Sequence, residues 1–170
     1  MPKPDSICEE SVYTSIFKDY SKNLYNFLYY KTGNLNLAKD LTQEAFTHLW
    51  KNCASVLLQN AQGYVFKTAN NLLINEYKHQ KVVLEFENIP RSDAHKESPA
   101  FLLEEKELKK QLELAIAELP EKQRIVFLLS RIDKKTYKQI AEIEGISKQA
   151  VEKRMYNALD SLRKVIEGIK

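Results

Sequence analysis

The sequence predicts an all-α protein of two small helical domains joined by a flexible linker. Residues that favour helices (Leu, Ala, Glu, Lys and Gln) dominate the 170-residue chain, and its four glycines are too few for an all-β fold. Apolar residues recur at steps of three and four along most of the chain. This period fails over residues 82–100, where prolines and mixed charges indicate a linker. We therefore expect domains at 8–81 and 101–170.

The first domain is expected to contain three helices, over residues 11–31, 36–52 and 59–80. Each has an apolar stripe, and together the three stripes could bury one core. Thr32, Gly33 and Asn34 end the first helix, and Asn36 is a plausible N-cap for the second.

The second domain is expected to contain four helices. The first, over residues 101–119, stops at Pro120, which stands just before the second, over 121–131. Thr136 opens a short helix over 137–144, and Gly145 follows as its C′ residue. Ser147 then caps the last long helix.

The bulk composition excludes several classes of protein. Cys8 and Cys53 are isolated and form no CxxC or Cys/His cluster, so we expect reduced thiols and no zinc site. No apolar stretch approaches the length of a signal peptide core or a membrane span, so we expect a cytoplasmic chain without membrane insertion. The histidines form no catalytic spacing with cysteine, and a Walker-type glycine loop is absent. We predict neither an enzyme nor a cofactor.

The net charge of +3 lies entirely in residues 101–170, where a helix-turn-helix pattern occurs. Ile140, Ala141, Gly145, Ile146 and Val151 occupy its structural positions. The second helix of such a motif enters the DNA major groove, where Lys, Gln and Glu can read base edges and Arg can bind phosphates. The predicted duplex contacts are Thr136, Lys138, Ser147, Lys148, Gln149, Glu152, Lys153, Arg154 and Asn157.

From spacing alone, other interpretations stay open. The corner could be structural, with a basic face that is simply solvated. The chain could be a helix-turn-helix repressor or activator that acts alone on DNA, and such proteins usually dimerise on palindromic sites. It could also be a helical adaptor, which would show no salt-dependent DNA affinity.

Three stretches carry a resemblance to a known family. They are "AKDLTQEAFTHLWKN" (38–52), "GYVFKTANNLLINEYKHQK" (63–81) and "LPEKQRIVFLLSRIDKKTYKQIAEIEGISKQAVEKRMYNALDSLRK" (119–164). In this order, with a variable linker between them, they resemble the small two-domain extracytoplasmic-function (ECF) sigma factors of the sigma-70 family. The resemblance covers roughly residues 10–168.

The resemblance implies an initiation subunit that binds core RNA polymerase and directs it to certain promoters. The first domain would capture the opened minus-ten element, and the second would read the minus-thirty-five element as duplex. An anti-sigma protein is a further partner that the family implies. The polymerase-binding residues would be Asp40, Gln43, Glu44 and His48, which share one helix face.

The minus-ten contacts follow from the same resemblance. Single-stranded bases need aromatic platforms, cations and polar groups, all of which occur near the third helix. Three positions depart from the family pattern: Tyr64 replaces Trp, Asn75 replaces Asp and Lys78 replaces Arg. The predicted contacts are Gln59, Asn60, Gln62, Tyr64, Lys67, Asn70, Asn71, Asn75 and Lys78.

Overall fold

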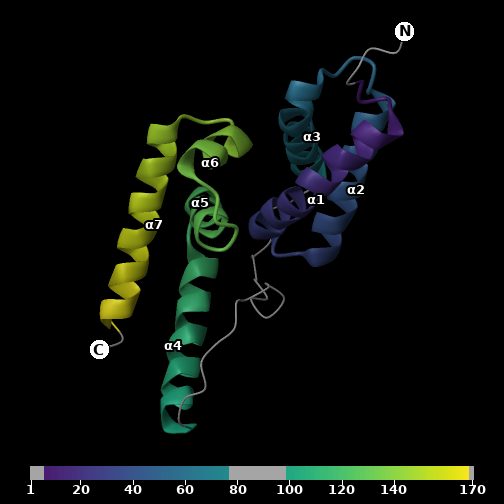
Figure 1. The fold of residues 1–170 in the computed structure, drawn as a ribbon. Coiled ribbons are helices and arrows are strands. Elements are labelled where there is room, and N and C mark those ends of the chain that lie inside the picture. Colours follow the sequence, from purple (N-terminus) through teal and green to yellow (C-terminus); the bar gives the residue numbers. More distant parts are fainter. Residues whose placement is uncertain (1–5, 77–98, 169–170) are drawn as a thin grey trace.

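The structure is a computed structural model that describes residues 6–76 and 99–168. The described residues form seven α-helices and one short 3-10 helix, arranged as two groups (Figure 1). The prediction of an all-α fold is therefore confirmed. The segment 77–98, which contains most of the predicted linker, lies outside the described residues.

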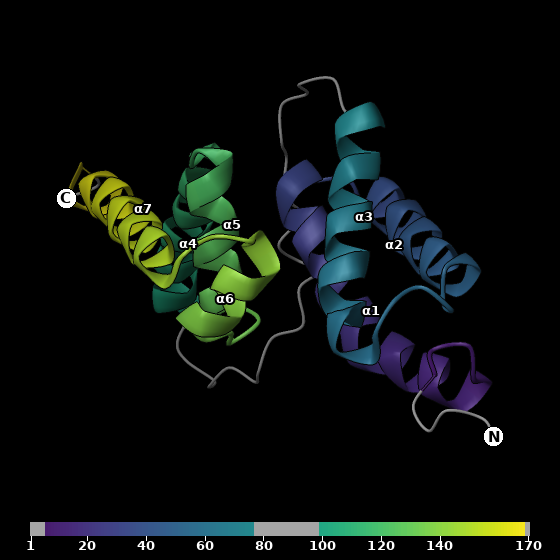
Figure 2. The same ribbon diagram turned by 90° about the horizontal axis from the view of Figure 1, so that it is seen from above.

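The first group contains α1 (Glu10–Thr32), α2 (Leu35–Lys51), the 3-10 helix η1 (Leu58–Asn60) and α3 (Ala61–Glu76). Helix α1 packs against both α2 and α3, and α2 also packs against α3 (Figure 2). The three helices enclose one core because each buries the apolar stripe that its sequence carries. The core side chains include Leu24, Leu28, Leu41, Phe46, Leu49, Val65 and Leu73.

The junction between α1 and α2 uses Gly33 and Asn34. Gly33 adopts a left-handed conformation at φ 64° and donates its N–H to Tyr29 O, which closes α1. The Asn34 side chain then accepts from Leu37 N at 3.0 Å and caps α2. The prediction that Asn36 caps the second helix was wrong, because α2 already begins at Leu35 and Asn36 lies inside its first turn. The last residues of the helix predicted over 59–80 fall outside the described part of the chain.

A disulfide joins Cys8 to Cys53. The prediction of two reduced thiols was therefore wrong. The cysteines are 45 residues apart in sequence, yet the chain brings their Cα atoms within 5.0 Å. It does so because Ile7, which is almost fully buried, anchors the segment before α1 in the same core that α2 lines.

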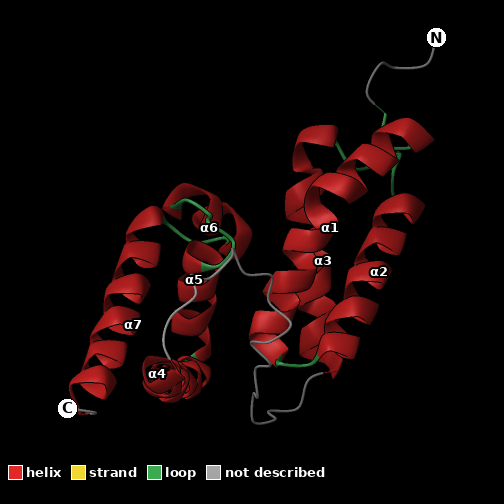
Figure 3. Ribbon diagram, turned by 60° about the horizontal axis from the view of Figure 1, so that its bottom comes forward, coloured by secondary structure: helices red, strands yellow, loops and turns green. Residues whose placement is uncertain are grey.

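The second group contains α4 (Pro99–Glu118), α5 (Glu121–Arg131), α6 (Tyr137–Glu144) and α7 (Lys148–Gly168). Helix α4 begins two residues earlier than expected, so residues 99 and 100 belong to a helix rather than to the linker. Helix α7 packs against α4, α5 and α6, and Figure 3 shows it at one side of this group. Their shared core includes Ile125, Leu129, Ile140, Val151, Met155 and Leu162. No described helix has the length and apolarity that a membrane span requires.

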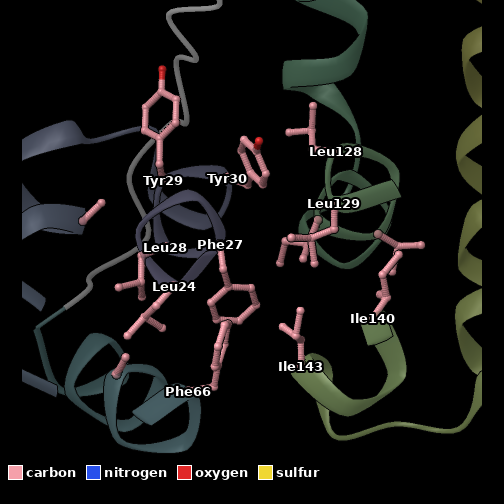
Figure 4. Close-up of a cluster of buried hydrophobic side chains, with 14 of the residues drawn as sticks. Leu24, Phe27, Leu28, Tyr29, Tyr30, Phe66, Leu128, Leu129, Ile140 and Ile143 are labelled. Carbon is pink, nitrogen blue, oxygen red and sulfur yellow. The ribbon is translucent and has the colours of Figure 1, made fainter. Parts of the chain in front are cut away.

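The two groups pack against each other, which the sequence did not predict. Helix α1 lies along α5, and α3 meets α6. Phe27, Tyr30 and Phe66 face Leu128, Leu129 and Ile143 across this boundary (Figure 4). All six side chains are buried, so the boundary is a continuous part of the hydrophobic core.

Candidate functional site

Helices α6 and α7 form the helix-turn-helix that the sequence predicted. Thr136 caps α6 through a capping box with Gln139, and Gly145 ends it with a left-handed φ of 65°. The Ser147 hydroxyl accepts from Ala150 N at 3.1 Å and caps α7. Ile140 and Val151 are fully buried between the helices and fix their crossing. Thr136 and Ser147 are exposed at the two helix starts, although each hydroxyl already serves as a cap.

The first two turns of α7 present a polar face to solvent. Lys148, Gln149, Glu152 and Lys153 are all exposed, and Asn157 is half-buried. Lys148 Nζ lies 3.5 Å from Glu152 Oε1, an exposed pair one helical turn apart. Such a pair contributes little to stability, so both side chains can turn to a ligand at small cost. Lys138 is exposed on α6.

Arg154 is placed differently from its neighbour Lys153. Its guanidinium donates to Glu144 Oε2 at 2.9 Å, which ties α7 to the end of α6. The Glu144 side chain is only 9% exposed, so this ion pair is largely shielded from water. Arg154 therefore has a structural partner that the sequence analysis did not foresee.

Tyr156 is the residue on this face that sequence reasoning missed. It is 71% exposed, more than any other large hydrophobic side chain of the described chain. It follows Lys148 and Glu152 at steps of four, so the helical period alone could have placed it on the same face.

Helix α2 carries the predicted polymerase-binding face. Asp40, Gln43 and Glu44 are exposed, and His48 is half-buried. His48 Nε2 lies 3.9 Å from Glu44 Oε1, so the two side chains meet across one helical turn. The opposite side of α2 is buried in the core of the first group, which leaves this polar face free in the described structure.

The predicted minus-ten residues are spread over η1 and α3. Gln59, Asn60, Lys67, Asn71 and Asn75 are exposed. Gln62, Tyr64 and Asn70 are half-buried, and Lys78 lies outside the described residues.

The amide oxygen of Asn70 already has a partner. It accepts from Lys31 Nζ, on α1, at 2.6 Å, and the Lys31 ammonium also lies over the Phe27 ring. Lys31 thus adds a cation to this surface that the sequence analysis did not single out. Phe66, in contrast, packs edge-to-face on Phe27 and belongs to the core.

Comparison with known proteins decides the family. Residues 16–82 match the family model for sigma-70 region 2, and residues 109–162 match the model for sigma-70 region 4. The ECF RNA polymerase sigma factor SigW of Bacillus subtilis (strain 168) is 25% identical over 175 residues, covering 95% of this chain and 92% of that protein. SigM of the same organism is 27% identical over 157 residues, covering 87% and 91%. The chain belongs to the ECF group of the sigma-70 family.

In this sigma factor, α2 and α3 fall within the region 2 match, and α5, α6 and residues 148–162 of α7 fall within the region 4 match. A solved RsbN–BldN complex is also similar, with 17% sequence identity and a TM-score of 0.37, covering 92% of this chain and 93% of that one.

Proposed function

We propose that this protein is a sigma factor that binds core RNA polymerase and directs it to specific promoters. The observation that carries the proposal is the presence of sigma-70 regions 2 and 4 in one chain and in that order. A repressor or activator that works without polymerase would need its helix-turn-helix but not region 2. We assign region 2 to residues 8–81, region 4 to the chain from the start of α4 at Pro99 onward, and the linker to the residues between them.

Binding of core polymerase is assigned to the exposed face of α2. Its exposed carboxylates, Asp40 and Glu44, suit charge-assisted hydrogen bonds to arginines of a partner. Gln43 and His48 complete the same face. Because the other side of α2 is fixed in the core, the face is presented on a rigid helix.

Reading of the minus-thirty-five duplex is assigned to the first turns of α7. Lys148, Gln149, Glu152 and Lys153 offer donors and acceptors for base edges in the major groove. Tyr156 extends this face by one turn, where its ring and hydroxyl can meet sugar and phosphate. The helix-turn-helix would hold α7 at a fixed angle to the groove.

Capture of the opened minus-ten strand is assigned to η1 and α3. Gln59 and Asn60 are exposed polar groups beside the start of α3, and a base taken out of its stack needs such open hydrogen-bonding partners. Lys67, with Lys31 from α1, supplies positive charge for the phosphates.

The same proposal includes the location of the protein, the absence of catalysis and an inhibitory partner. The protein would act in the cytoplasm together with the polymerase, without catalysing a reaction itself and without a cofactor. An anti-sigma protein that covers the polymerase-binding face would hold it inactive.

The test combines two measurements on the purified chain. It should be retained by bacterial core RNA polymerase in a pull-down, and it should produce new start sites in run-off transcription on a promoter library. Salt-sensitive DNA binding as a dimer, without retention by core polymerase, would instead establish the repressor or activator.

A paired substitution on α2 tests the proposed polymerase-binding face. Asp40→Ala with Glu44→Ala should weaken core binding by roughly tenfold or more, because two charge-assisted contacts are lost. Circular dichroism should show unchanged helicity, since both side chains are exposed and Ala favours helices. Glu104→Ala with Glu105→Ala makes the same charge change on exposed positions of α4 and serves as the control. Equal loss of core binding in both pairs would remove α2 from the proposal.

A further inference from the structure

One cysteine of the Cys8–Cys53 disulfide is exposed to solvent. Cys8 lies just before α1 on the surface, and Cys53 is half-buried in the loop that leads from α2 to η1. A small thiol or a peroxide can therefore reach the pair while the protein stays folded. Exposed disulfides are more easily reduced than structural ones, and cytosolic disulfides usually serve catalysis or redox sensing.

We propose that Cys8 and Cys53 form a reversible redox switch, with a peroxide as the oxidant and a dithiol as the reductant. In the disulfide form, the bond holds the α2–α3 loop (residues 52–60) in the conformation that captures the opened minus-ten strand. The role of the loop and the cytoplasmic setting rest on the proposed function. The switch itself rests on the position and exposure of the two cysteines.

The oxidation needs only the two cysteines and the peroxide. The Cys8 thiolate attacks one oxygen of hydrogen peroxide, the O–O bond breaks, and hydroxide leaves to give a sulfenic acid. The Cys53 thiolate then attacks the Cys8 sulfur, the S–O bond breaks, and a second hydroxide leaves as the disulfide forms. Over both steps the two thiols lose two protons and two electrons, and the peroxide becomes two water molecules. A dithiol reverses the reaction: it attacks the Cys8 sulfur, releases Cys53 as a thiol, and leaves as its own disulfide.

The disulfide ties the α2–α3 loop to a distant part of the chain. Residues 54, 55 and 57–60 are exposed, so the loop buries little of its surface. The hydrogen bonds within it are local: Cys53 N–H donates to Trp50 O at 3.2 Å, and Ser55 N–H donates to Asn52 O at 3.0 Å. The bond to Cys8 adds a covalent connection across 45 residues. Its loss should therefore give the loop more conformations.

The helices beside the loop have contacts that do not depend on the disulfide. Tyr13 Oη, on α1, donates to Phe46 O, on α2, at 2.9 Å. The Tyr13 ring also packs edge-to-face on Trp50, with 5.0 Å between the ring centroids. Ile7, next to Cys8, is only 1% exposed and stays anchored in the core. Reduction should thus leave α1 and α2 packed together and act mainly on the loop.

The state of the loop matters for Gln59 and Asn60, the exposed residues assigned to base capture. A loop that is ordered before binding loses less conformational entropy when the strand binds. The disulfide form should therefore hold the opened strand more tightly than the reduced form. Region 4 contains no cysteine, so its contacts to duplex DNA should not respond to the switch.

The first test needs neither DNA nor polymerase. The full chain is equilibrated with mixtures of reduced and oxidised glutathione, its free thiols are alkylated, and the alkyl groups are counted by mass spectrometry. The protein should pass from no alkylated cysteine to two within the series, and hydrogen peroxide should return the reduced protein to none. A disulfide that persists at the highest excess of reduced glutathione would overturn the switch. So would a reduced chain that peroxide does not close into the disulfide.

Amide hydrogen exchange on the oxidised and reduced chain locates the structural change. Residues 52–60 should exchange roughly tenfold faster in the reduced form, while the amides of α7 should exchange as before. The variant Cys8→Ser, Cys53→Ser should exchange like the reduced wild type, with or without peroxide. Equal exchange of residues 52–60 in the two wild-type forms would overturn the effect on the loop.

Strand capture is measured with the oxidised and the reduced chain, each freed of reagent and then assembled with core polymerase. The probe is a single-stranded oligonucleotide that carries the minus-ten element of the run-off promoter. Fluorescence anisotropy should show roughly three- to tenfold tighter binding by the oxidised form. A duplex that carries only the minus-thirty-five element should bind both forms equally.

The Cys8→Ser, Cys53→Ser variant, treated in the same two ways, is the matched control and should show no difference in strand affinity. Equal strand affinity of the two wild-type forms would overturn the control of capture by the disulfide. Failure of the chain to assemble with core polymerase would instead overturn the proposed function. The thiol count and the hydrogen exchange would still decide whether the two cysteines are a switch that acts on the loop.

Discussion

Two neighbouring cations on α7 have different surroundings. Lys153 is exposed, whereas Arg154 lies against Glu144 in an ion pair that is largely shielded from water. A carboxylate that loses its partner in such a place stays desolvated, which costs more than the loss of an exposed pair. The two residues should therefore separate stability from DNA binding.

Arg154→Ala should lower the free energy of unfolding by about 1–3 kcal/mol, because it leaves Glu144 without its cation. Lys153→Ala should leave stability within about 0.5 kcal/mol and weaken duplex promoter binding, with a smaller dependence of affinity on salt. Thermal unfolding and anisotropy titrations at several salt concentrations measure both effects. If Arg154→Ala weakened duplex binding without changing stability, Arg154 would be a phosphate contact, as the sequence predicts, and not a structural residue.

The sequence could not distinguish these two residues. Helical period placed Lys148, Gln149, Glu152 and Lys153 on the solvent face, where the structure has them. The partner of Arg154 belongs to the preceding helix, and its position depends on the angle at which α6 and α7 cross. Tyr156 follows the same helical period, which could have placed it on this face. How much of its side chain is exposed depends on the packing of the core.

At the scale of elements, periodicity and capping chemistry predicted the helices well. The bounds of α5 and the caps of α6 and α7 agree with the structure, because Pro120, Thr136, Gly145 and Ser147 are strong local signals. The disulfide was missed because it depends on how the segment before α1 packs across the end of α2. Sequence spacing contains no information on that contact.

Reduction of the Cys8–Cys53 bond should destabilise region 2. The bond closes a loop that spans 45 residues and limits the unfolded chain, so its loss should lower the free energy of unfolding by about 2–4 kcal/mol. Thermal unfolding with and without dithiothreitol measures the effect. The Cys8→Ser, Cys53→Ser variant should unfold like the reduced protein and should not respond to dithiothreitol. Identical unfolding of the oxidised and reduced wild type would show that the bond contributes nothing.

At the scale of the whole molecule, the sequence predicted two domains but not their docking. Asn26 on α1 and Asp133 in the turn after α5, which share a hydrogen bond, are 107 residues apart, and neither stands out in the local sequence pattern. Arg124 lies within the stretch 119–164 that carries the family resemblance, but its donation to the end of α1 requires both domains in place. Contacts of this kind are set by tertiary packing, which local propensity does not encode.

Docking also buries a carboxyl group, which makes it sensitive to pH. Burial raises the pKa of Asp133 above its ordinary value, although the hydrogen bonds from Tyr30 and Asn26 and the charges of Lys135 and Lys22 act in the opposite direction. The ionised form therefore opposes docking. When the pH falls toward the raised pKa, the docked form takes up a proton more readily than the separated form, so acidification should favour docking.

The radius of gyration of the wild type should accordingly decrease as the pH is lowered from about 7 to about 5, the range that leads down toward a raised carboxyl pKa. Asp133→Asn keeps an oxygen that can accept from Tyr30 and Asn26 but cannot titrate, so its radius of gyration should change much less. Every other titratable group is the same in the two proteins, which assigns the difference to Asp133. Expansion of the wild type on acidification, or equal responses from both proteins, would contradict a docked state in which this carboxyl is buried.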